Sequence, residues 1–346
     1  MRVFLYEFVT GGGWLSSGAK PEASLLREGG AMVSALTTDL CRIDGLQLDV
    51  MRGHGMAESL LSGSTVHTVS TAAEEWRTFQ QLSEQADWTI LIVPELDNLL
   101  VRRAEVVVAV GGRLLGSSLE AMRVASNKQQ LCEWLDRDGI PVPCGQTLVA
   151  GQAIPDSLHF PVVLKRIDGA GSMDMSLISS EAATMELAPK IHWRVEAFCP
   201  GVPCSIAFLC GGDHYVDLLP GRQLIDSMNG FAYSGSVWPL PPALERRARD
   251  LGTRALRSLP RLAGYVGVDL ILGAAADGRE DVVVEVNPRL TTSYVGLRAL
   301  TKDNLAQVMV DVVQERTVAI EFDRKAMHLM ADGQLRTGLS KTPESG

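Results

Sequence analysis

Three oxygen-bearing side chains in the C-terminal part of the sequence have the types and the spacing to hold a metal ion. Asp269 lies within the apolar run 264–272, and Glu285 and Asn287 close a second apolar run that starts at 281. Gly and Asp residues separate the two runs, which predicts a β-hairpin. Side chains two residues apart on a strand lie on one face, so Glu285 and Asn287 should converge with Asp269 across the hairpin.

The chemistry that suits this donor set is the binding of a hard divalent cation. Carboxylate and amide oxygens, with no His or Cys among them, favour Mg²⁺ held together with a phosphate, with Mn²⁺ as the alternative and Zn²⁺ excluded. We therefore expect a nucleotide site. Two other interpretations stay open: Asp269 as a charge on an edge strand, and Asn287 before a proline as a turn. Two acids that face each other in apolar strands are unfavourable without a cation between them, which favours the metal.

The composition argues against several classes of partner. The chain has 346 residues, of which 46% are hydrophobic, so it is long enough for roughly two or three domains with their own cores. Its formal net charge is −9, and neither Lys nor Arg forms a run, which argues against a general nucleic-acid or anionic-membrane surface. We expect small-molecule partners.

The cysteines and the first residues predict a cytoplasmic protein. The six cysteines include no CxxC pair and lack the density of a disulfide scaffold, so reduced thiols are expected. The spacing of Cys199, Cys204 and Cys210 fits a metal site less well than it fits buried, small apolar side chains. The apolar start of the chain is too short for a signal peptide, and no stretch approaches the roughly 20 apolar residues of a membrane span.

The first third of the chain alternates short apolar strands with helices, which is typical of a parallel sheet covered on both faces. The glycine triplet 11–13 after the first strand lets backbone approach a ligand, but contiguous glycines do not match the GxGxxG dinucleotide fingerprint. The expected strands are 3–9, 46–53, 88–95 and 106–110, and the expected helices are 25–43, 72–85 and 97–103.

Two acids follow strands of this expected sheet. Glu7 and Glu95 each come after apolar strand residues. In open α/β sheets ligands gather at the carboxyl ends of the strands, so both acids are candidates for lining a substrate cleft. Solvated loop acids are the competing interpretation.

Two lysines in the middle of the chain are candidates for phosphate binding. Lys128 opens a helix over 129–135, and Lys165 projects from a strand that precedes a loop with Gly169 and Gly171. A lysine beside a glycine loop can neutralise a phosphate while free N–H groups of the loop cover it. The GxxxxGK[ST] pattern is absent, so this is no Walker A loop. Isolated surface charges are the alternative for each lysine.

Two further segments could complete a nucleotide site. A strand that ends at Glu196, Ala197 and Phe198 and then turns could edge a purine, although any strand and turn gives the same pattern. Residues 213–239 mix Tyr, Ser, Asn and Gly, which suggests a loop folded over a site. Helices are expected at 244–259 and 304–313, and the polar end KTPESG is expected to fray.

Taken in order, these elements resemble the ATP-grasp superfamily of carboxylate–amine ligases over about residues 100–300. The resemblance rests on Lys128 at a helix start, Lys165 followed by DGAGS, VEAFCPG at 195–201, Asp269, and EVNPR at 285–289. The segments YEFVTGGG and EGGAM, and the PE after the strand at 90–93, are similar to the tyramine–glutamate ligase group of methanofuran biosynthesis. That group has relatives in bacteria with methanopterin-linked one-carbon metabolism.

The resemblance implies a fold and a role for each site residue. An ATP-grasp fold (α/β, with α+β character in its C-terminal part) would follow an N-terminal Rossmann-like pre-ATP-grasp domain. The implied division is 1–115 for that domain, 116–195 for a central lobe with the glycine loop, 196–325 for a C-terminal lobe with the metal site, and 326–346 for a tail. Lys128 and Lys165 would contact the phosphates of ATP, and Gly169, Gly171 and Ser172 would cover them. Glu196 with the main chain of Ala197 and Phe198 would hold adenine, and Asp269, Glu285 and Asn287 would bind Mg²⁺. Arg289 with Lys165 would act in catalysis, and Glu7, Glu95 and Arg222 would lie near the substrates.

The implied reaction is amide formation. A substrate carboxylate would attack the γ-phosphate of ATP to give an acyl phosphate, and an amine would then displace phosphate. L-Glutamate and tyramine, or a related amine, are the first expected pair, and a homodimer is compatible with the sequence.

Two other functions remain as alternatives: another amino-acid or dipeptide ligase of the D-alanine–D-alanine type, and an ATP-binding regulatory protein without turnover. Two departures from the family pattern favour the regulatory protein. Pro203 replaces an acid that binds ribose in many members, and Gly267 and Val268 stand where some members carry an arginine.

Overall fold

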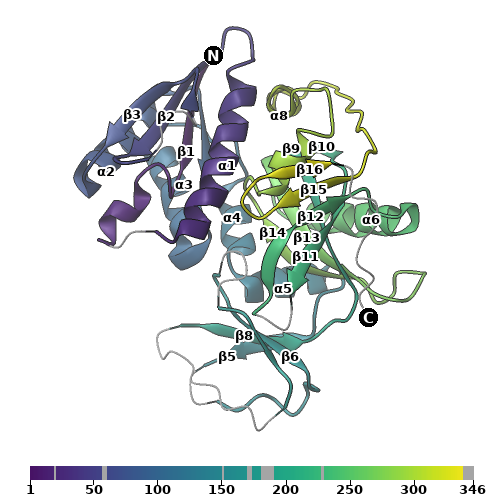
Figure 1. The fold of residues 1–346 in the computed structure, drawn as a ribbon. Helices are drawn as coiled ribbons and strands as arrows, with labels where there is room; N and C mark the ends of the chain where they lie inside the picture. The colour runs from purple at the N-terminus through teal and green to yellow at the C-terminus, as the bar shows by residue number, and fades with distance from the viewer. Residues whose placement is uncertain are drawn as a thin grey trace.

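The structure is a computed structural model that describes residues 1–18, 21–56, 61–149, 152–169, 174–180, 191–226 and 230–337. Three sheets organise this part of the chain: a four-stranded N-terminal sheet, a second four-stranded sheet from the middle of the chain, and an eight-stranded C-terminal sheet. In Figure 1 the first and the last lie side by side, and the middle sheet lies below them. Among the described helices, none combines the length and the apolar composition that crossing a bilayer requires.

The N-terminal sheet is parallel, as predicted, with strand order β3-β2-β1-β4. Its strands are β1 Arg2–Glu7, β2 Gln47–Gly53, β3 Thr65–Val69 and β4 Trp88–Ile92. Helices α1 Ala23–Leu40, α2 Ala72–Gln85 and α3 Leu99–Ala109 connect or follow these strands, and the 3-10 turns η1 Gly13–Ser16 and η3 Leu96–Asn98 lie in the loops. Because all four strands run the same way, the segments after β1 and β4 leave from one edge of the sheet.

The prediction of a strand at 106–110 is wrong, since this segment is the second half of α3. Only one side of it is covered: Val107 is buried, whereas Val108 is 50% exposed. A short run of β-branched residues cannot be assigned by periodicity alone, and here the apolar stripe of the preceding helix continues through it. The buried apolar residues of α3 recur at helical spacing: Leu100, Val101, Ala104 and Val107.

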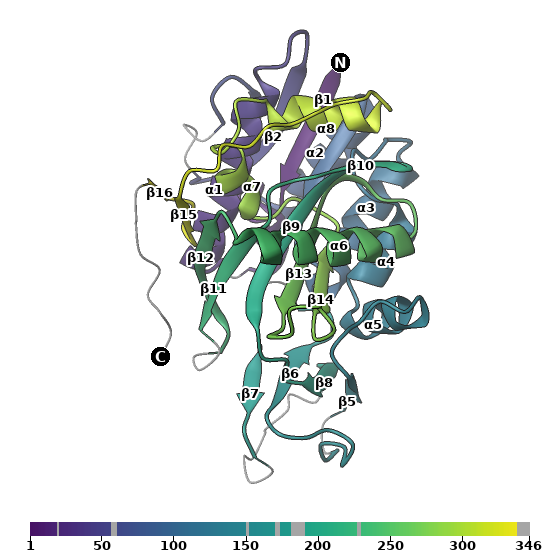
Figure 2. The ribbon, with the colours of Figure 1, turned by 90° about the vertical axis from the view of Figure 1, so that its right-hand side faces the viewer.

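The middle of the chain forms two helices and an antiparallel sheet of order β5-β8-β6-β7. The elements are α4 Leu119–Ala125, α5 Lys128–Arg137, β5 Gly145–Leu148, β6 Val162–Arg166, β7 Ser176–Ile178 and β8 Trp193–Ala197. Figure 2 shows this sheet below the C-terminal sheet, with α5 beside the region where the two sheets meet. The predicted helix after Lys128 and the predicted strands around Lys165 and Glu196 are confirmed.

The C-terminal sheet has the strand order β14-β13-β9-β11-β12-β15-β16, with β10 paired to β9. Alternate residues of β9 face two different cores: Ile206 and Phe208 pack with α6, whereas Ala207 and Leu209 pack with α8 and the N-terminal domain. The strands are β9 Val202–Gly211, β10 His214–Asp217, β11 Gly221–Asp226, β12 Ala232–Trp238, β13 Ala263–Leu272, β14 Val282–Asn287, β15 Met327–Met330 and β16 Leu335–Thr337. The helices are α6 Pro242–Ser258, α7 Ser293–Leu297 and α8 Leu305–Val313.

The prediction of a loop over 213–239 is wrong in its described part, because β10, β11 and β12 occupy most of it. The polar and apolar residues of these strands follow no regular alternation, and their Gly, Ser and Asn neighbours are typical of turns, so the segment carries no clear strand signal. The β-hairpin predicted over 264–286 is confirmed as β13 and β14, an antiparallel pair with a register shift after Asp269.

The segment 326–346, expected to be a tail, begins with two strands of the C-terminal sheet. β15 pairs with β12, and β16 pairs with β15. The turn between β15 and β16 reaches the first helix, because a Cβ at Gly333 would lie 2.5 Å from the Cβ of Ala31 in α1. The end KTPESG, expected to fray, lies outside the described residues.

Candidate active site

The β13–β14 hairpin brings the three predicted metal ligands together. Asp269 lies directly opposite Glu285, and Gly267 lies opposite Asn287. The Asp269 carboxylate accepts hydrogen bonds from Gln223 Nε2 at 3.0 Å and from Asn287 Nδ2 at 3.2 Å. Burial, and the negative charge of the facing Glu285, raise the pKa of Asp269 from 3.8 to about 7. A cation placed between the two carboxylates would reverse this penalty.

The donor set fits Mg²⁺. Two carboxylates and the amide oxygen of Asn287 are hard ligands, and Mg²⁺ commonly completes its shell with substrate phosphates and water. The described residues contain no group of three or more His, Cys, Asp or Glu side chains that could hold a metal. Cys204 and Cys210 instead belong to an apolar core, and burial raises the pKa of both thiols.

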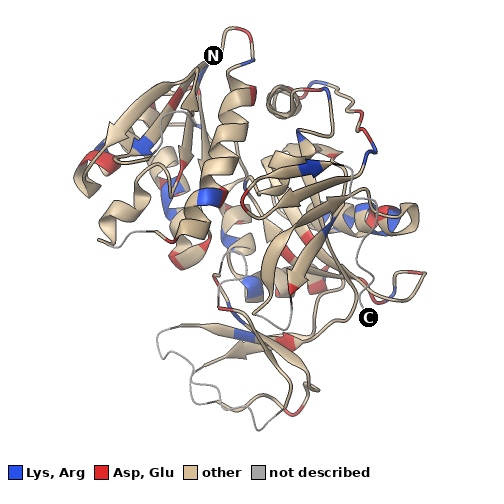
Figure 3. Ribbon diagram, in the orientation of Figure 1, with Lys and Arg blue, Asp and Glu red and all other residues tan. Residues whose placement is uncertain are grey.

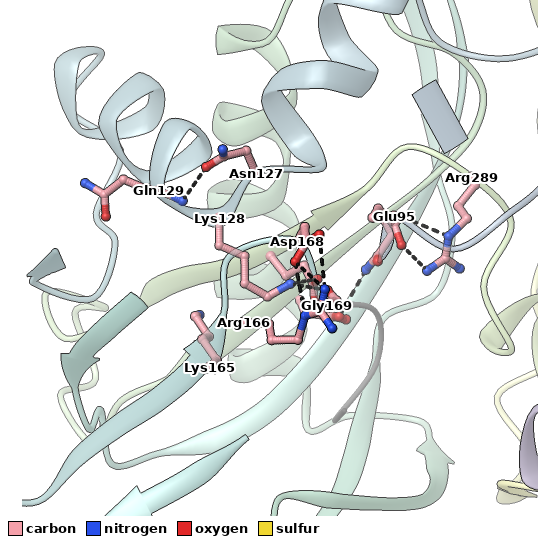
Figure 4. Close-up of polar contacts among 12 residues, drawn as sticks. Glu95, Asn127, Lys128, Gln129, Lys165, Arg166, Asp168, Gly169 and Arg289 are labelled. Carbon is pink, nitrogen blue, oxygen red and sulfur yellow. Dashed lines mark hydrogen bonds and ion pairs between the residues drawn. The ribbon is translucent and has the colours of Figure 1, made fainter. Parts of the chain in front are cut away.

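Lys128 lies beside the hairpin at the start of α5. The side chain of Asn127 caps this helix by accepting hydrogen bonds from the N–H groups of Gln129 and Gln130, at 3.1 and 3.0 Å. Lys128 Nζ contacts Glu285 Oε1 at 2.5 Å. It also donates to the carbonyl of Gly169 at 2.6 Å, as Figure 4 shows. Burial alone would lower the pKa of Lys128, but the Glu285 carboxylate outweighs burial and raises it.

Lys165 lies on β6 within a second buried cluster of charges. Its Nζ pairs with Glu196 Oε1 at 2.6 Å, and Glu196 Oε2 accepts from Arg194 Nε at 2.8 Å. Arg194 is fully buried and also donates to Gln129 of α5 and to the carbonyl of Pro143 at 2.9 Å. Two cations share one carboxylate, so the cluster carries a net positive charge that suits an anion.

The strand end proposed for adenine uses its donors within the chain. The N–H of Ala197 donates to the carbonyl of Cys144 at 2.8 Å, and the N–H of Phe198 donates to the carbonyl of Pro161 at 3.2 Å. Both oxygens of Glu196 are paired, as described above. The binding of adenine here would therefore rely on carbonyl groups and apolar surface, or on exchange of these contacts. Gly169 follows β6, the strand that pairs with β8, whereas Gly171 and Ser172 lie outside the described residues.

Arg289 joins the C-terminal sheet to the N-terminal domain. It follows β14, and its guanidinium forms a two-point ion pair with Glu95, Nε to Oε1 at 2.9 Å and Nη2 to Oε2 at 2.6 Å. Burial would lower the pKa of Arg289, but Glu95 raises it. Glu95 is 2% exposed, so the alternative of a solvated loop acid does not describe it.

Glu7 and Arg222 do not join this group directly. The Glu7 carboxylate accepts from the N–H of Val9 at 3.1 Å and from both the N–H and the hydroxyl of Thr10, at 2.5 and 2.6 Å, so it braces the loop after β1. Arg222 is the neighbour of Gln223 on β11, and alternation along a strand directs it to the opposite face from the contact with Asp269.

Two site residues were absent from the expectations. Gln223 lies in the segment predicted as a loop, so its strand position could not be inferred. Arg194 stands two residues before Glu196 on the same face of β8, and this spacing was a usable signal.

Figure 3 shows basic and acidic residues interspersed along α6 and around the C-terminal sheet. The site charges at Lys128, Lys165 and Glu196 are buried and act on their immediate neighbours.

Comparison with known proteins agrees with this architecture. Residues 125–293 match the family described as ATP-grasp domain, and residues 46–122 match the pre ATP-grasp 3 domain. The chain is similar to the tyramine–L-glutamate ligase of Methanocaldococcus fervens, with 25% identity over 70% of this chain and 72% of that protein. The enzyme of the same name from Methanocaldococcus jannaschii is 26% identical over 66% of this chain, and the chain spans only 63% of its length.

A solved structure carries the same fold. The ATP-grasp superfamily protein from Archaeoglobus fulgidus superposes with a TM-score of 0.70 at 22% identity, covering 95% of this chain and 92% of that one. The fold agrees with the two domains matched in the sequence. The chain belongs to the ATP-grasp superfamily of ATP-dependent ligases.

Proposed function

We propose that the protein joins the carboxylate of L-glutamate to an amine such as tyramine, with ADP and phosphate as the other products. The single observation that carries the proposal is the meeting of Asp269, Glu285 and Lys128 at one point, with 2.5 Å between Lys128 Nζ and Glu285 Oε1. This arrangement supports phosphoryl transfer from ATP. The choice of substrates follows the two similar tyramine–L-glutamate ligases, and methanofuran-type cofactor synthesis is the corresponding setting.

The chain's own residues would supply positioning and charge. Lys128 and Lys165 would neutralise the phosphates of ATP, and Arg289 would steady the phosphoryl group as it moves to the substrate carboxylate. Asp269, Glu285 and Asn287 would hold Mg²⁺, which would supply positive charge to stabilise the negative charge that develops on the phosphates. The amine would then attack the acyl phosphate. No covalent nucleophile from the protein is required.

The Lys128–Glu285 contact implies an exchange of partners on nucleotide binding. Both side chains are nearly buried, so each charge needs a partner at all times. If Glu285 turns to a cation, Lys128 becomes available for a phosphate oxygen. Mg²⁺ would then pair with the Glu285 carboxylate, and a phosphate of ATP would pair with the Lys128 ammonium, so both buried charges would keep a partner of opposite sign.

The test is ADP release measured with L-glutamate and tyramine together, and with each omitted in turn. We expect release only when both are present. Glu285→Ala should abolish it while the protein stays folded, judged by circular dichroism. Unchanged turnover of this variant at saturating Mg²⁺ would contradict the metal assignment. Release with a different amine or amino acid would identify another ligase of this class, and tight ATP binding without release under any pair would support a regulatory protein.

A further inference from the structure

A short segment of the N-terminal domain contacts both other parts of the site. Residues 95–98 leave the sheet after β4 and include η3 Leu96–Asn98. Asp97 and Asn98 have left-handed backbone conformations, with φ of 50° and 58°. Such conformations are costly for residues other than glycine and persist where surrounding contacts hold them. Figure 4 shows Glu95 beside Arg289 on one side of the site, with Asp168 and Gly169 between it and Lys128.

The contact with Glu95 decides how Arg289 presents its donors. A guanidinium carries five N–H donors. Glu95 takes one from Nε and one from Nη2, and the carbonyl of Leu290 takes one from Nη1 at 3.2 Å. Two N–H groups remain in the described part of the structure, one on each terminal nitrogen. Together they can donate to two oxygens of one phosphoryl group.

At its other end, the segment 95–98 contacts Asp168, the residue that follows β6 and directly precedes Gly169. The N–H of Asp97 donates to Asp168 Oδ2 at 2.9 Å. Arg166 lies between the two acids, with Nη2 at 3.1 Å from Asp97 Oδ1 and Nε at 3.2 Å from Asp168 Oδ1. The next residue, Gly169, offers its carbonyl to Lys128 Nζ.

We infer that residues 95–97 form a positioning segment: Glu95 orients Arg289 toward the phosphoryl group, and the backbone of Asp97 fixes Asp168 and hence the carbonyl that holds Lys128. The inference rests on the proposed phosphoryl transfer. It makes the N-terminal domain part of the catalytic apparatus, with two separable effects. Loss of Glu95 affects the transferred group, and loss of Asp168 affects the bound nucleotide.

The first experiment compares Glu95→Gln with wild type in two assays. Glu95→Gln should lower kcat for ADP release about 10- to 100-fold, since small displacements of a catalytic group have effects of this size, while MgADP affinity stays within about twofold. The second assay needs no substrate: MgADP raises the melting temperature, and adding beryllium fluoride, a phosphoryl mimic, should raise it further in wild type. Glu95→Gln should keep the MgADP shift and lose the additional one.

The second experiment separates the two ends of the segment. Asp168→Ala should raise the KM for ATP about threefold or more with a smaller change in kcat. Glu105→Gln is the matched control, since Glu105 lies on α3 of the same domain as Glu95 and this change removes a charge from an exposed ion pair, with Arg123 of α4. It should change none of these quantities.

These results can overturn the inference. A pair that only joins two domains would lower the melting temperature of Glu95→Gln and leave kcat and the beryllium fluoride shift intact. Equal loss of MgADP affinity and kcat would also contradict a positioning role. If Glu95→Gln does not fold, Glu95→Asp, which keeps the charge and shortens the reach, takes its place in the same assays. If wild type releases no ADP with any pair, the proposed function fails, and the thermal shifts still decide the role of Glu95.

Discussion

We expect the ionised carboxylate of Asp269 to lower the stability of the folded protein when no cation is bound, so that replacing it should raise the free energy of unfolding. Its pKa is raised from 3.8 to about 7. A carboxyl whose pKa is higher in the folded than in the unfolded state binds its proton more tightly when folded. Its favourable contribution is therefore full below pH 3.8 and is lost as the pH rises through about 7. Without a bound cation, the ionised carboxylate of Asp269 therefore lowers the stability of the folded protein near neutral pH.

The structure sets the magnitude. The difference between 3.8 and about 7 corresponds to about 4 kcal/mol at 1.36 kcal/mol per pH unit. Asp269 keeps some solvent exposure, and an asparagine there would face the Nδ2 donor of Asn287, so both effects reduce the gain. We expect Asp269→Asn to raise the free energy of unfolding by about 1 to 3 kcal/mol at pH 8. At pH 5 the gain should be about half as large or smaller.

The assay is urea unfolding in EDTA without nucleotide, at pH 5 and pH 8. Glu285→Gln is the control on the facing strand, with the opposite expected sign, because it leaves the buried ammonium of Lys128 without its carboxylate. Lower stability of Asp269→Asn at pH 8, or a gain equal at both pH values, would refute the reasoning. Saturating Mg²⁺ should stabilise wild type and leave Asp269→Asn unchanged.

Two other substitutions test the supports of the site. Arg194→Met removes one partner of Glu196 and leaves the half-buried Gln129 oxygen and the buried Pro143 carbonyl without this donor. We expect a loss of about 3 to 5 kcal/mol in urea unfolding, and a neutral effect would mean that the cluster is not held by this arginine. Gly29→Ala places a Cβ 2.7 Å from the Glu7 carboxylate and should destabilise by about 1 to 3 kcal/mol. Gly116→Ala, whose Cβ would meet nothing closer than 3.7 Å, should be nearly neutral in the same measurement, and equal effects of both would contradict the packing argument.

Sequence patterns predicted the elements whose signals are local. The hairpin that carries Asp269 and Glu285 has two apolar runs and a turn, and its register follows from alternation. The start of α5 has a capping Asn127 directly before Lys128. The strand at 106–110 was mispredicted because its helical stripe begins upstream, and β11 was missed because its residues are partly exposed and polar.

Partners distant in sequence could not be inferred in the same way. Glu95 and Arg289 are separated by 194 residues, and nothing near either one specifies the other. For Glu7, the position at the end of a strand was predicted correctly. The N–H and hydroxyl groups that donate hydrogen bonds to its carboxylate, however, come from the loop that follows. The position of Glu7 at the carboxyl end of a strand was therefore predictable, whereas the availability of its carboxylate for a ligand was not.

The contact between Gly333 and Ala31 has a consequence for how the chain is made. The first long helix and the last described hairpin touch, and α1 shares its apolar core with Met327 and Leu329 of β15. The N-terminal domain therefore emerges from the ribosome with one face of α1 uncovered, and β15 can cover that face only after residues 327–330 have been synthesised. A deletion from residue 326 onward would leave β12 as a bare edge and expose the same face, so we expect such a fragment to aggregate although every proposed catalytic residue is still present.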